Sequence, residues 1–471
     1  MNEQTTTELS RRAFLGKTAG GLGGVALSCL LRQDAVAGPL LPHFAPKAKR
    51  VIYLFMSGGP SQVDTFDSKP LLNRLDGKMM PASIIKNHQF AMIKTKNPTV
   101  KGSPWKFQKH GQSGIEISEL FPHLAKQADR LCVINGMYAD VPSHPECFLQ
   151  LHTGSFQFVR PSVRAWALYG LGTSNENLPG FIVLTSKGGG QGQPIAARQW
   201  SSGFLPGRHQ GVHLKSQGEP VHYVSSPDGP DLVGQRRLVD AVARLNAAEN
   251  ERNPDPEIET RLAQYEMAYK MQASVPELAD VSTEPQHVLD SYGPDVMRRG
   301  SFAQNCLLAR RLAEKGVRFV QLMHAGWDQH GNLPTQLAVQ CRDTDQPSAA
   351  LVKDLKQRGL LDETLVIWGG EFGRTSFCQG DINNKKAHGR DHHPRNFCLW
   401  MAGGGIKGGA NYGKSDDFSY NVAEKPVHVH DLQATTLHLL GIEHEKLTYK
   451  FQGRDFRLTD VHGKVVKEIL A

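Results

Sequence analysis

The fold class follows from residues 50–60, which read RVIYLFMSGGP. Six apolar residues in a row, Val51 to Met56, include β-branched and aromatic side chains, and a Ser-Gly-Gly-Pro turn ends the run. A continuous apolar run of this length is typical of a strand buried on both faces, as strands in a parallel sheet are. Similar runs recur at residues 131–134, 181–184, 317–322, 364–368 and 397–401.

Helical patterns lie between several of these runs. Residues 306–315 have apolar side chains on one helical face, and residues 348–358 form a second helical stretch that Gly359 closes. Strands that alternate with helices over this length predict an α/β fold with a parallel sheet. Residues 185–300 differ, because a Gly/Gln-rich stretch at 188–193 is followed by a charged region with helical spacing. We predict a helical excursion there, packed beside the sheet.

The N-terminus predicts export from the cytoplasm. Residues 10–17, SRRAFLGK, read as a twin-arginine signal, and a small-x-small cleavage site follows at residues 35–37. The intervening apolar run of about 14 residues is shorter than the ~20 that a membrane span needs. The residues around Cys29 depart from a lipoprotein box. We therefore predict a signal peptide at residues 1–37 and, at 38–471, a single periplasmic or extracellular domain without a membrane span.

Composition narrows the class of protein further. The chain has 471 residues, of which 39% are hydrophobic and 21% charged, so it can bury a large core and is not a disordered chain. Its formal charge of +8 is modest and no nucleic-acid-binding motif is present, which argues against a nucleic-acid partner. The six cysteines beyond residue 37 contain no CxxC pair. Disulfides and buried thiols both stay open, as does the oligomeric state.

Polar residues cluster directly after the predicted strands. In a parallel sheet, ligands gather at the carboxyl ends of the strands, so these residues are candidates for a site. The candidates, in chain order, are Ser57 and Asp64, Ser143 and His144, Asp328 and His330, Glu371 and Arg374, and Arg390, His392 and His393. Imidazole and carboxylate groups bind divalent metals, and guanidinium groups bind anions. The expected cofactor is a divalent metal, with zinc, manganese or calcium as candidates.

Taken together, five motifs resemble a known family. They are MSGGPSQVDTFD at 56–67, GWDQH at 326–330, GGEFGRT at 369–375, GRDHHP at 389–394 and GRDFRLTDV at 453–461. The resemblance is to the secreted bacterial proteins called domain of unknown function 1501 (DUF1501), which are similar to the alkaline phosphatase/sulfatase superfamily. It covers nearly the whole mature chain. It implies an alkaline-phosphatase-like fold, a three-layer α/β/α sandwich around a mostly parallel sheet.

The superfamily comparison also implies roles for single residues. Enzymes of this fold carry a nucleophile ten residues before the Gly of a Thr-Gly pair, which here is Thr153-Gly154, so the slot falls on His144. His144 is then either a metal ligand or a phosphoryl acceptor, with Ser143 as a neighbouring nucleophile. The implied metal ligands are Asp328, His330, Glu371, His392 or His393, with oxygens from Ser57 and Asp64. Arg374 and Arg390 are expected to hold an anion.

These residues support two functions. The first is a metal-dependent hydrolase that acts on a phosphate or sulfate ester of a small molecule or glycan. The second is a non-catalytic relative that binds an anionic glycan or a partner protein, because Ser57, His144 and Phe372 occupy positions where the superfamily has other residues. Whether catalysis is retained stays open at this stage.

Overall fold

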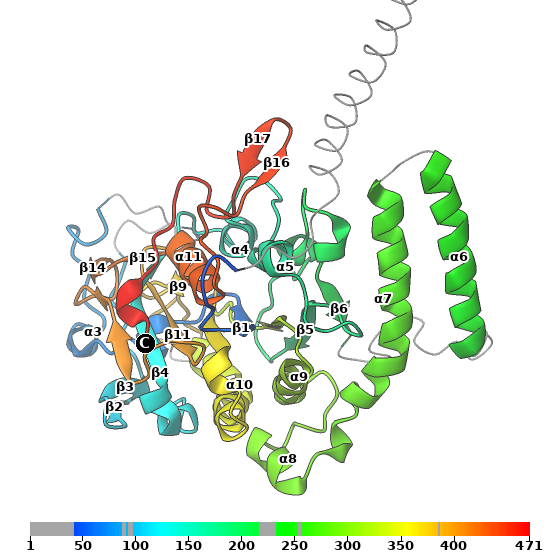
Figure 1. Ribbon diagram of the computed structural model, residues 1–471. Coiled ribbons are helices and arrows are strands. Elements are labelled where there is room, and N and C mark those ends of the chain that lie inside the picture. The colour runs from blue at the N-terminus through cyan, green and yellow to red at the C-terminus, as the bar shows by residue number, and fades with distance from the viewer. Residues whose placement is uncertain (1–41, 87–90, 93–97, 216–231, 253–255, 385–386) are drawn as a thin grey trace, which may run out of the picture. The chain divides into compact units, whose positions relative to one another are not determined.

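The computed structural model describes residues 42–471 except 87–90, 93–97, 216–231, 253–255 and 385–386 (Figure 1). The predicted signal peptide at 1–37 lies outside the described residues. Residues 42–471 form one compact unit. Among the described residues, no helix combines the length and the apolar character needed to cross a bilayer.

A nine-stranded sheet forms the centre of this unit. Its strands, in spatial order, are β12 (Ala410–Tyr412), β4 (Leu131–Tyr138), β11 (Phe397–Ala402), β8 (Thr364–Gly369), β1 (Arg50–Ser57), β7 (Phe319–Ala325), β5 (Phe181–Lys187) and β6 (Val212–Leu214), while β15 (Val427–His428) pairs with β4. Only the two pairings of β11, with β4 and β8, are antiparallel. The sheet is therefore mostly parallel, as predicted.

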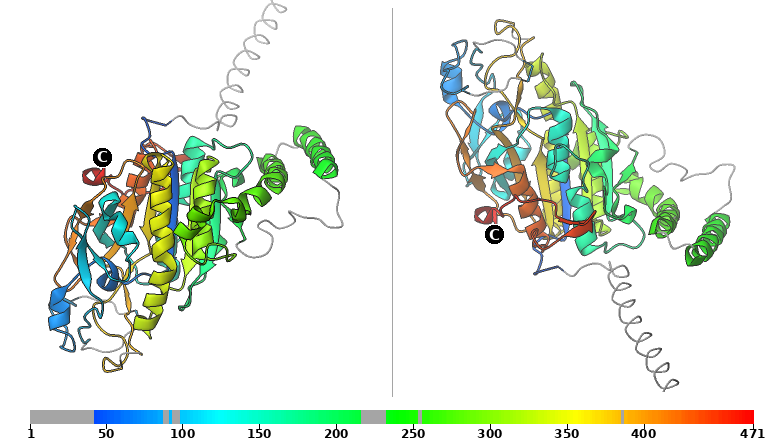
Figure 2. Two further views of the ribbon diagram at one scale, coloured as in Figure 1. Left: turned by 90° about the horizontal axis from the view of Figure 1, so that it is seen from below. Right: turned by 90° about the horizontal axis from the view of Figure 1, so that it is seen from above.

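Helices cover both faces of the sheet. Alternate residues of β1 divide between two cores, with Ile52, Leu54 and Met56 in one and Val51, Tyr53 and Phe55 in the other. The first core includes side chains of α9 (Phe302–Glu314) and α10 (Leu333–Gln357), and the second those of α4 (His144–Thr153), α5 (Val163–Leu171) and α11 (Val429–Leu439). Figures 1 and 2 show these two groups of helices on opposite sides of the sheet. The predicted three-layer α/β/α sandwich is confirmed.

Shorter elements complete the fold. The remaining helices are α2 (Gln62–Thr65), α3 (Pro70–Arg74), α6 (Leu232–Arg252), α7 (Pro256–Ala279) and α8 (Gln286–Tyr292). Four two-stranded ribbons are formed by β2 (Phe107–His110) with β3 (Ile115–Ser118), β9 (Gly373–Arg374) with β10 (His392–His393), β13 (Lys414–Ser415) with β14 (Val422–Glu424), and β16 (Tyr449–Phe451) with β17 (Arg454–Phe456).

The segment predicted as a helical excursion contains more than helices. It begins within β5 and adds β6 to the edge of the central sheet before α6 and α7. An ion pair of 2.8 Å between Arg236 and Glu266 joins α6 to α7. Leu238 and Leu245 of α6, which are two helical turns apart and belong to the charged region with helical spacing, are 59% and 73% exposed. The periodicity therefore identified the helix correctly, although these two side chains lie outside the core.

Two predicted elements differ from those observed. The helix expected at 348–358 is the second half of α10, which begins at Leu333 and continues through Pro347. A proline usually breaks a helix, because it lacks the N–H that bonds to the preceding turn. The strand expected at 397–401 is present as β11 but runs antiparallel to its neighbours. Apolar runs do not reveal strand direction.

The six described cysteines are all free thiols and all buried. Burial raises the pKa of Cys132 to about 12, so its thiolate is scarce at neutral pH. The sequence left open whether these cysteines form disulfides or are buried thiols, and in the structure they are buried thiols.

Candidate metal centre

The carboxyl ends of five strands meet at one edge of the sheet. β1, β5, β7 and β8 are parallel to one another, and β4 shares their direction because β4 and β8 both pair antiparallel with β11. Predicted site residues follow four of these strands: His144 after β4, Asp328 and His330 after β7, and Glu371 after β8, with Ser57 ending β1. The ribbon of β9 and β10 adds His392, which pairs with Arg374.

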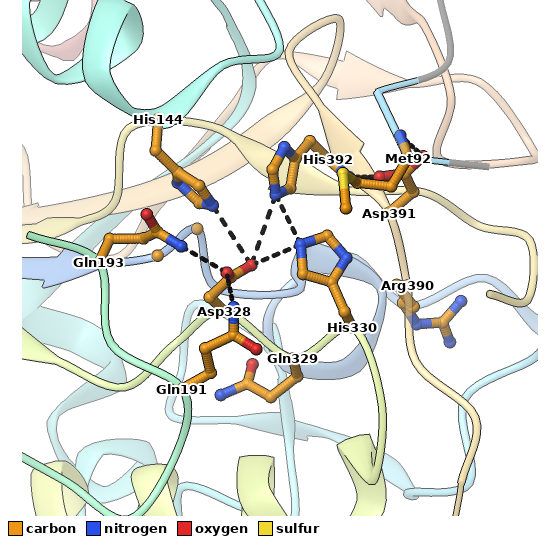
Figure 3. Close-up of polar contacts among 12 residues, drawn as sticks. Met92, His144, Gln191, Gln193, Asp328, Gln329, His330, Arg390, Asp391 and His392 are labelled. Carbon is orange, nitrogen blue, oxygen red and sulfur yellow. Dashed lines mark hydrogen bonds and ion pairs between the residues drawn. The ribbon is translucent and has the colours of Figure 1, made fainter. Parts of the chain in front are cut away.

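Four of these side chains converge, and we call them the histidine cluster: His144, Asp328, His330 and His392 (Figure 3). Oδ1 of Asp328 lies 2.9 Å from Nε2 of His330, 3.2 Å from Nε2 of His144 and 3.4 Å from Nε2 of His392. One candidate ligand atom from each residue lies within 4.8 Å of all the others. The side chain of Asp328 is 1% exposed and that of His330 is 16% exposed. Solvent therefore reaches the cluster on the side of His330.

The three imidazole rings are oriented by hydrogen bonds at their outer nitrogens. Nδ1 contacts an acceptor oxygen in each ring: Glu371 Oε1 at 2.5 Å for His144, Gln379 Oε1 at 2.7 Å for His330 and the Pro142 carbonyl at 2.8 Å for His392. Carboxylate and carbonyl oxygens only accept, so Nδ1 carries the proton in each neutral ring. The lone pair of Nε2 is then left to face the centre of the cluster. Metal-binding histidines in proteins show this same arrangement.

The donor set of the cluster fits a divalent transition metal. Nε2 of His330 lies 2.8 Å from Nε2 of His392, a separation at which two lone pairs repel unless a proton or cation is shared between them. Three imidazole nitrogens and one carboxylate oxygen make up a four-ligand zinc-type site, and manganese and iron accept the same donors. Calcium prefers six to eight oxygen ligands, so this set fits calcium poorly.

Electrostatics keep the central carboxylate ionised. Burial alone would raise the pKa of Asp328, but the contacts of Oδ1 with the three Nε2 atoms, which donate when they carry a proton, and the charge of Arg374 hold this pKa far below its usual range. A bound cation would take the place of those protons, because a histidine ligand must be deprotonated. Burial lowers the pKa of His392 to about 4, and the nearby Arg374 adds to this effect. Burial also acts to lower the pKa of His144, but its hydrogen bonds to Asp328 and Glu371 outweigh it and raise this pKa. The cluster thus presents a negative centre to a cation.

Two predicted site residues support the cluster from behind. Arg374 is fully buried and donates to Oδ1 of Asp328 at 2.7 Å, and its other N–H groups donate to backbone carbonyls, among them Gly59 at 2.9 Å. Glu371, expected as a metal ligand, accepts from His144 and, with both oxygens, from the Gly58 N–H at 3.2 Å. Arg374 therefore holds Asp328 rather than an exposed anion, and Glu371 holds the first histidine.

The structure places two further candidates, Asp64 and Arg390, outside the cluster. Their side chains form a buried ion pair with N–O distances of 2.8 and 3.1 Å. The remaining Arg390 donors contact backbone carbonyls, including that of Thr375 at 3.1 Å. Because Asp64 neutralises its charge inside the protein, Arg390 in this structure serves packing between loops rather than the anion binding expected from the sequence.

The last three candidates have different surroundings. His393 points away from the cluster and donates from Nε2 to the carbonyl of Tyr420. Ser57 is buried at the end of β1, where its carbonyl accepts from the Trp327 N–H at 3.2 Å. Ser143 is the residue that precedes α4, and its hydroxyl makes no capping hydrogen bond to that helix. Ser143 precedes His144 and His393 follows His392, so both adjoin a member of the cluster in the chain, while Ser57 does not.

Several residues of the site are not predicted by the sequence. Pro142 contributes a backbone carbonyl, which no side-chain pattern reveals, and Gln379 lies in a loop without a distinctive motif. Gln191 and Gln193 donate to the second oxygen of Asp328. Their Gly/Gln-rich stretch was noticed for its composition, which carries no information about a partner.

Comparisons with known proteins place the chain in a family. Residues 48–470 match the model of a protein family of unknown function, DUF1501. The chain therefore belongs to the DUF1501 family, as its motifs predicted. Comparison with the curated proteins gave no match.

Among solved structures, the similar ones include members of the alkaline phosphatase superfamily. A sulfatase from Pseudoalteromonas sp. is 12% identical, with a TM-score of 0.33 and coverage of 90% of this chain and 72% of that one. The alkaline phosphatase of the Antarctic bacterium TAB5 is 10% identical, with a TM-score of 0.35 and coverage of 84% and 99%. A superfamily protein from Vibrio parahaemolyticus is 10% identical, with a TM-score of 0.33 and coverage of 86% and 70%.

Proposed function

We propose that this member of the DUF1501 family binds one divalent transition metal at the histidine cluster and hydrolyses a phosphate or sulfate ester. The observation that supports the proposal is the orientation of the three imidazole rings in the cluster. Three Nε2 atoms face Oδ1 of Asp328, while each Nδ1 is bound to an acceptor that fixes its proton. Zinc is the metal that this four-ligand set favours.

The residues around the proposed metal have different roles in binding the metal and in orienting its ligands. His144 is a ligand in this proposal and not a nucleophile, because its Nδ1 is bound to Glu371 and its Nε2 faces Asp328. A divalent metal held by these four residues would supply Lewis-acid chemistry to an ester oxygen or acidify a water by accepting that oxygen as a fifth ligand. The ester anion approaches on the side of His330, where solvent reaches the cluster. His144 lies at the N-terminus of α4, whose dipole favours negative charge at the cluster. Ser143 adjoins that end and is the candidate hydroxyl nucleophile.

One observation favours the second candidate function, a non-catalytic protein that binds an anionic glycan or partner. The guanidinium groups of both Arg374 and Arg390 are buried and bound to protein oxygens, so neither presents a cation to a substrate. In that case the metal would stabilise the loops at the strand ends.

We also propose that the protein works outside the cytoplasm after twin-arginine export. The support is the SRRAFLGK segment at residues 10–17 and the cleavage site at 35–37. Export of a folded chain would allow the metal to be loaded before the protein leaves the cell.

The test begins with protein exported by its native route. Metal content, measured by inductively coupled plasma mass spectrometry, is expected to be about one equivalent per chain. The same protein is expected to hydrolyse an aryl phosphate or aryl sulfate. His330→Ala is expected to lose both metal and turnover. His462→Ala, an exposed histidine outside the cluster, is the matched control and should retain both. Metal without turnover of any ester would support the binding protein, and absence of metal would refute both forms of the proposal.

A further inference from the structure

The Gly/Gln-rich loop that follows β5 runs beside the loop that carries Asp328. Parallel pairing of β5 with β7 extends to Lys187 opposite Ala325. Beyond it, the N–H of Gly188 donates to the Ala325 carbonyl at 2.9 Å, and the N–H of Asp328 donates to the Gln191 carbonyl at 3.3 Å. Backbone hydrogen bonds therefore continue the contact of the two strands into the loops.

Glycines make this close approach possible. A Cβ atom on Gly190 would lie 2.0 Å from the carbonyl oxygen of Gly326, and one on Gly188 would lie 2.4 Å from the amide of Gln340. Both distances are far below van der Waals contact. A side chain at 190 would meet backbone and push the loop away from the β7 loop, whereas at 188 it would displace the Gln340 side chain of α10. The glycine-rich composition of this stretch thus has a local geometric cause.

The loop delivers two side-chain amides to Asp328 (Figure 3). Nε2 of Gln193 donates to Oδ2 of Asp328 at 2.6 Å, and Nε2 of Gln191 donates to the same oxygen at 3.0 Å. The other oxygen, Oδ1, faces the three histidines and accepts from Arg374. The two carboxylate oxygens therefore have separate roles, since one is occupied by neutral donors and the other faces the cluster.

We propose that Gln191 and Gln193 are positioning residues that hold Asp328 as a one-oxygen metal ligand and thereby set the affinity and geometry of the metal site. The inference rests on the proposed function, because it requires a metal at the histidine cluster. Hydrogen bonds from outer residues orient ligands, and their loss typically weakens metal binding by about 10–100-fold. With both amides in place, Oδ2 is blocked, and Asp328 binds through Oδ1 alone.

The experiment measures metal affinity rather than turnover. Gln191→Met and Gln193→Met keep the side-chain volume and remove the donor. Zinc affinity, measured by competition with a chromophoric chelator, is expected to fall about 10–100-fold in each variant. Gln286→Met, on the exposed surface of α8, is the matched control and is expected to bind zinc as the unchanged protein does.

A cobalt(II) spectrum separates positioning from packing. With Oδ2 released, Asp328 can bind through both oxygens, so the coordination number rises and the visible absorption of the cobalt protein weakens. In Gln193→Glu, a carboxylate faces Oδ2, and its repulsion is expected to weaken zinc binding at least as much as Gln193→Met does. A role in packing alone would leave the cobalt spectrum unchanged.

The outcomes distinguish this inference from the proposed function. If the unchanged protein binds zinc and both Gln→Met variants bind it equally well with the same cobalt spectrum, the positioning role is refuted and the proposed function stands. If zinc affinity falls as expected but no ester is hydrolysed, the positioning role stands and the hydrolase is refuted. If the unchanged protein binds no metal, both are refuted.

Discussion

Asp328→Asn tests whether the buried ion pair between Asp328 and Arg374 stabilises the fold at the centre of the site. Arg374 is fully buried, and Asp328 is the carboxylate that it contacts, at 2.7 Å. Removal of one partner of a buried ion pair costs about 3–5 kcal/mol, because the other charge is left without compensation. In the metal-free protein, Asp328→Asn is therefore expected to lower the free energy of unfolding by about 3–5 kcal/mol.

The size of the protein converts this cost into a temperature. At about 2.1 cal/mol/K per residue, a unit of roughly 430 residues unfolds with an entropy of about 0.9 kcal/mol/K. The melting temperature of Asp328→Asn in a chelator is then expected to fall by about 3–6 °C. Glu363→Gln is the matched control, since it removes a carboxylate from an exposed ion pair with Lys49 and should cost less than about 1 kcal/mol.

A double-mutant cycle with Arg374→Met completes this test. If charge pairing dominates, the double variant loses far less stability than the sum of the two single losses, because no unpaired charge remains. Zinc binding is expected to be lost in every variant that lacks Asp328, whatever its stability. Additive losses, or a melting temperature for Asp328→Asn within 1 °C of the unchanged protein, would refute the reasoning.

Three further outcomes are expected. Glu371→Gln weakens the acceptor that orients His144, so zinc affinity by chelator competition should fall about 10–100-fold, and an unchanged affinity would contradict this role. Burial lowers the pKa of His324 from 6.5 to about 4, so it is neutral in the fold while the unfolded chain takes up a proton below pH 6.5. Stability present above pH 6.5 should fall by up to about 3 kcal/mol as the pH drops to 4. In His324→Gln, the free energy of unfolding, measured by urea titration between pH 6.5 and 4, should fall less steeply with pH than in the unchanged protein. Equal slopes for the two proteins would contradict this role of His324. Replacement of both Arg11 and Arg12 by Lys should leave the precursor in the cytoplasm on immunoblots of cell fractions, whereas normal export would exclude the twin-arginine route.

Much of the fold could be predicted because the central strands are buried on both faces. Residues 51–56 and 365–368 are continuous apolar runs, and both correspond to strands whose every residue beyond Arg50 is buried. The first half of helix α10 was missed, because the predicted helix began at residue 348, although Leu333, Leu337 and Cys341 are buried at helical spacing before it. The direction of β11 depends on connections across the sheet, which local sequence does not encode.

The sequence could predict those site residues that come directly after a predicted strand. Asp328, His330 and His392 or His393 were expected to lie together. The rule that parallel strands end at one edge predicts this for Asp328 and His330, whereas the role of His392 or His393 followed from the family resemblance. The partners of these residues were not predictable, because a guanidinium has the same appearance in a sequence whether it binds a substrate or a protein carbonyl. Burial of Arg374 and pairing of Arg390 with Asp64 are properties of the folded chain.

If the proposed hydrolase activity holds, the charges at the histidine cluster favour a particular class of ester. With the three imidazoles neutral, as metal ligands are, Asp328 and Glu371 each contribute a negative charge and Arg374 one positive charge, so the charges at the cluster sum to minus one. A divalent cation changes this sum to plus one. Uncompensated charge is costly in a buried site, so a substrate with a single negative charge balances the site best. Sulfate monoesters and phosphodiesters have that charge at pH 8, whereas phosphate monoesters are dianions.

The metal-loaded protein is therefore expected to prefer an aryl sulfate or a phosphodiester over an aryl phosphate at pH 8. A difference of one uncompensated charge is expected to change kcat/KM by at least about tenfold, which corresponds to about 1.4 kcal/mol. Lowering the pH from 8 to 6 converts part of the phosphate monoester to the monoanion, because its second pKa is about 6, so the preference should narrow. A phosphate monoester that is the best substrate at pH 8 would contradict the charge balance, because that dianion would leave the site with an unpaired negative charge.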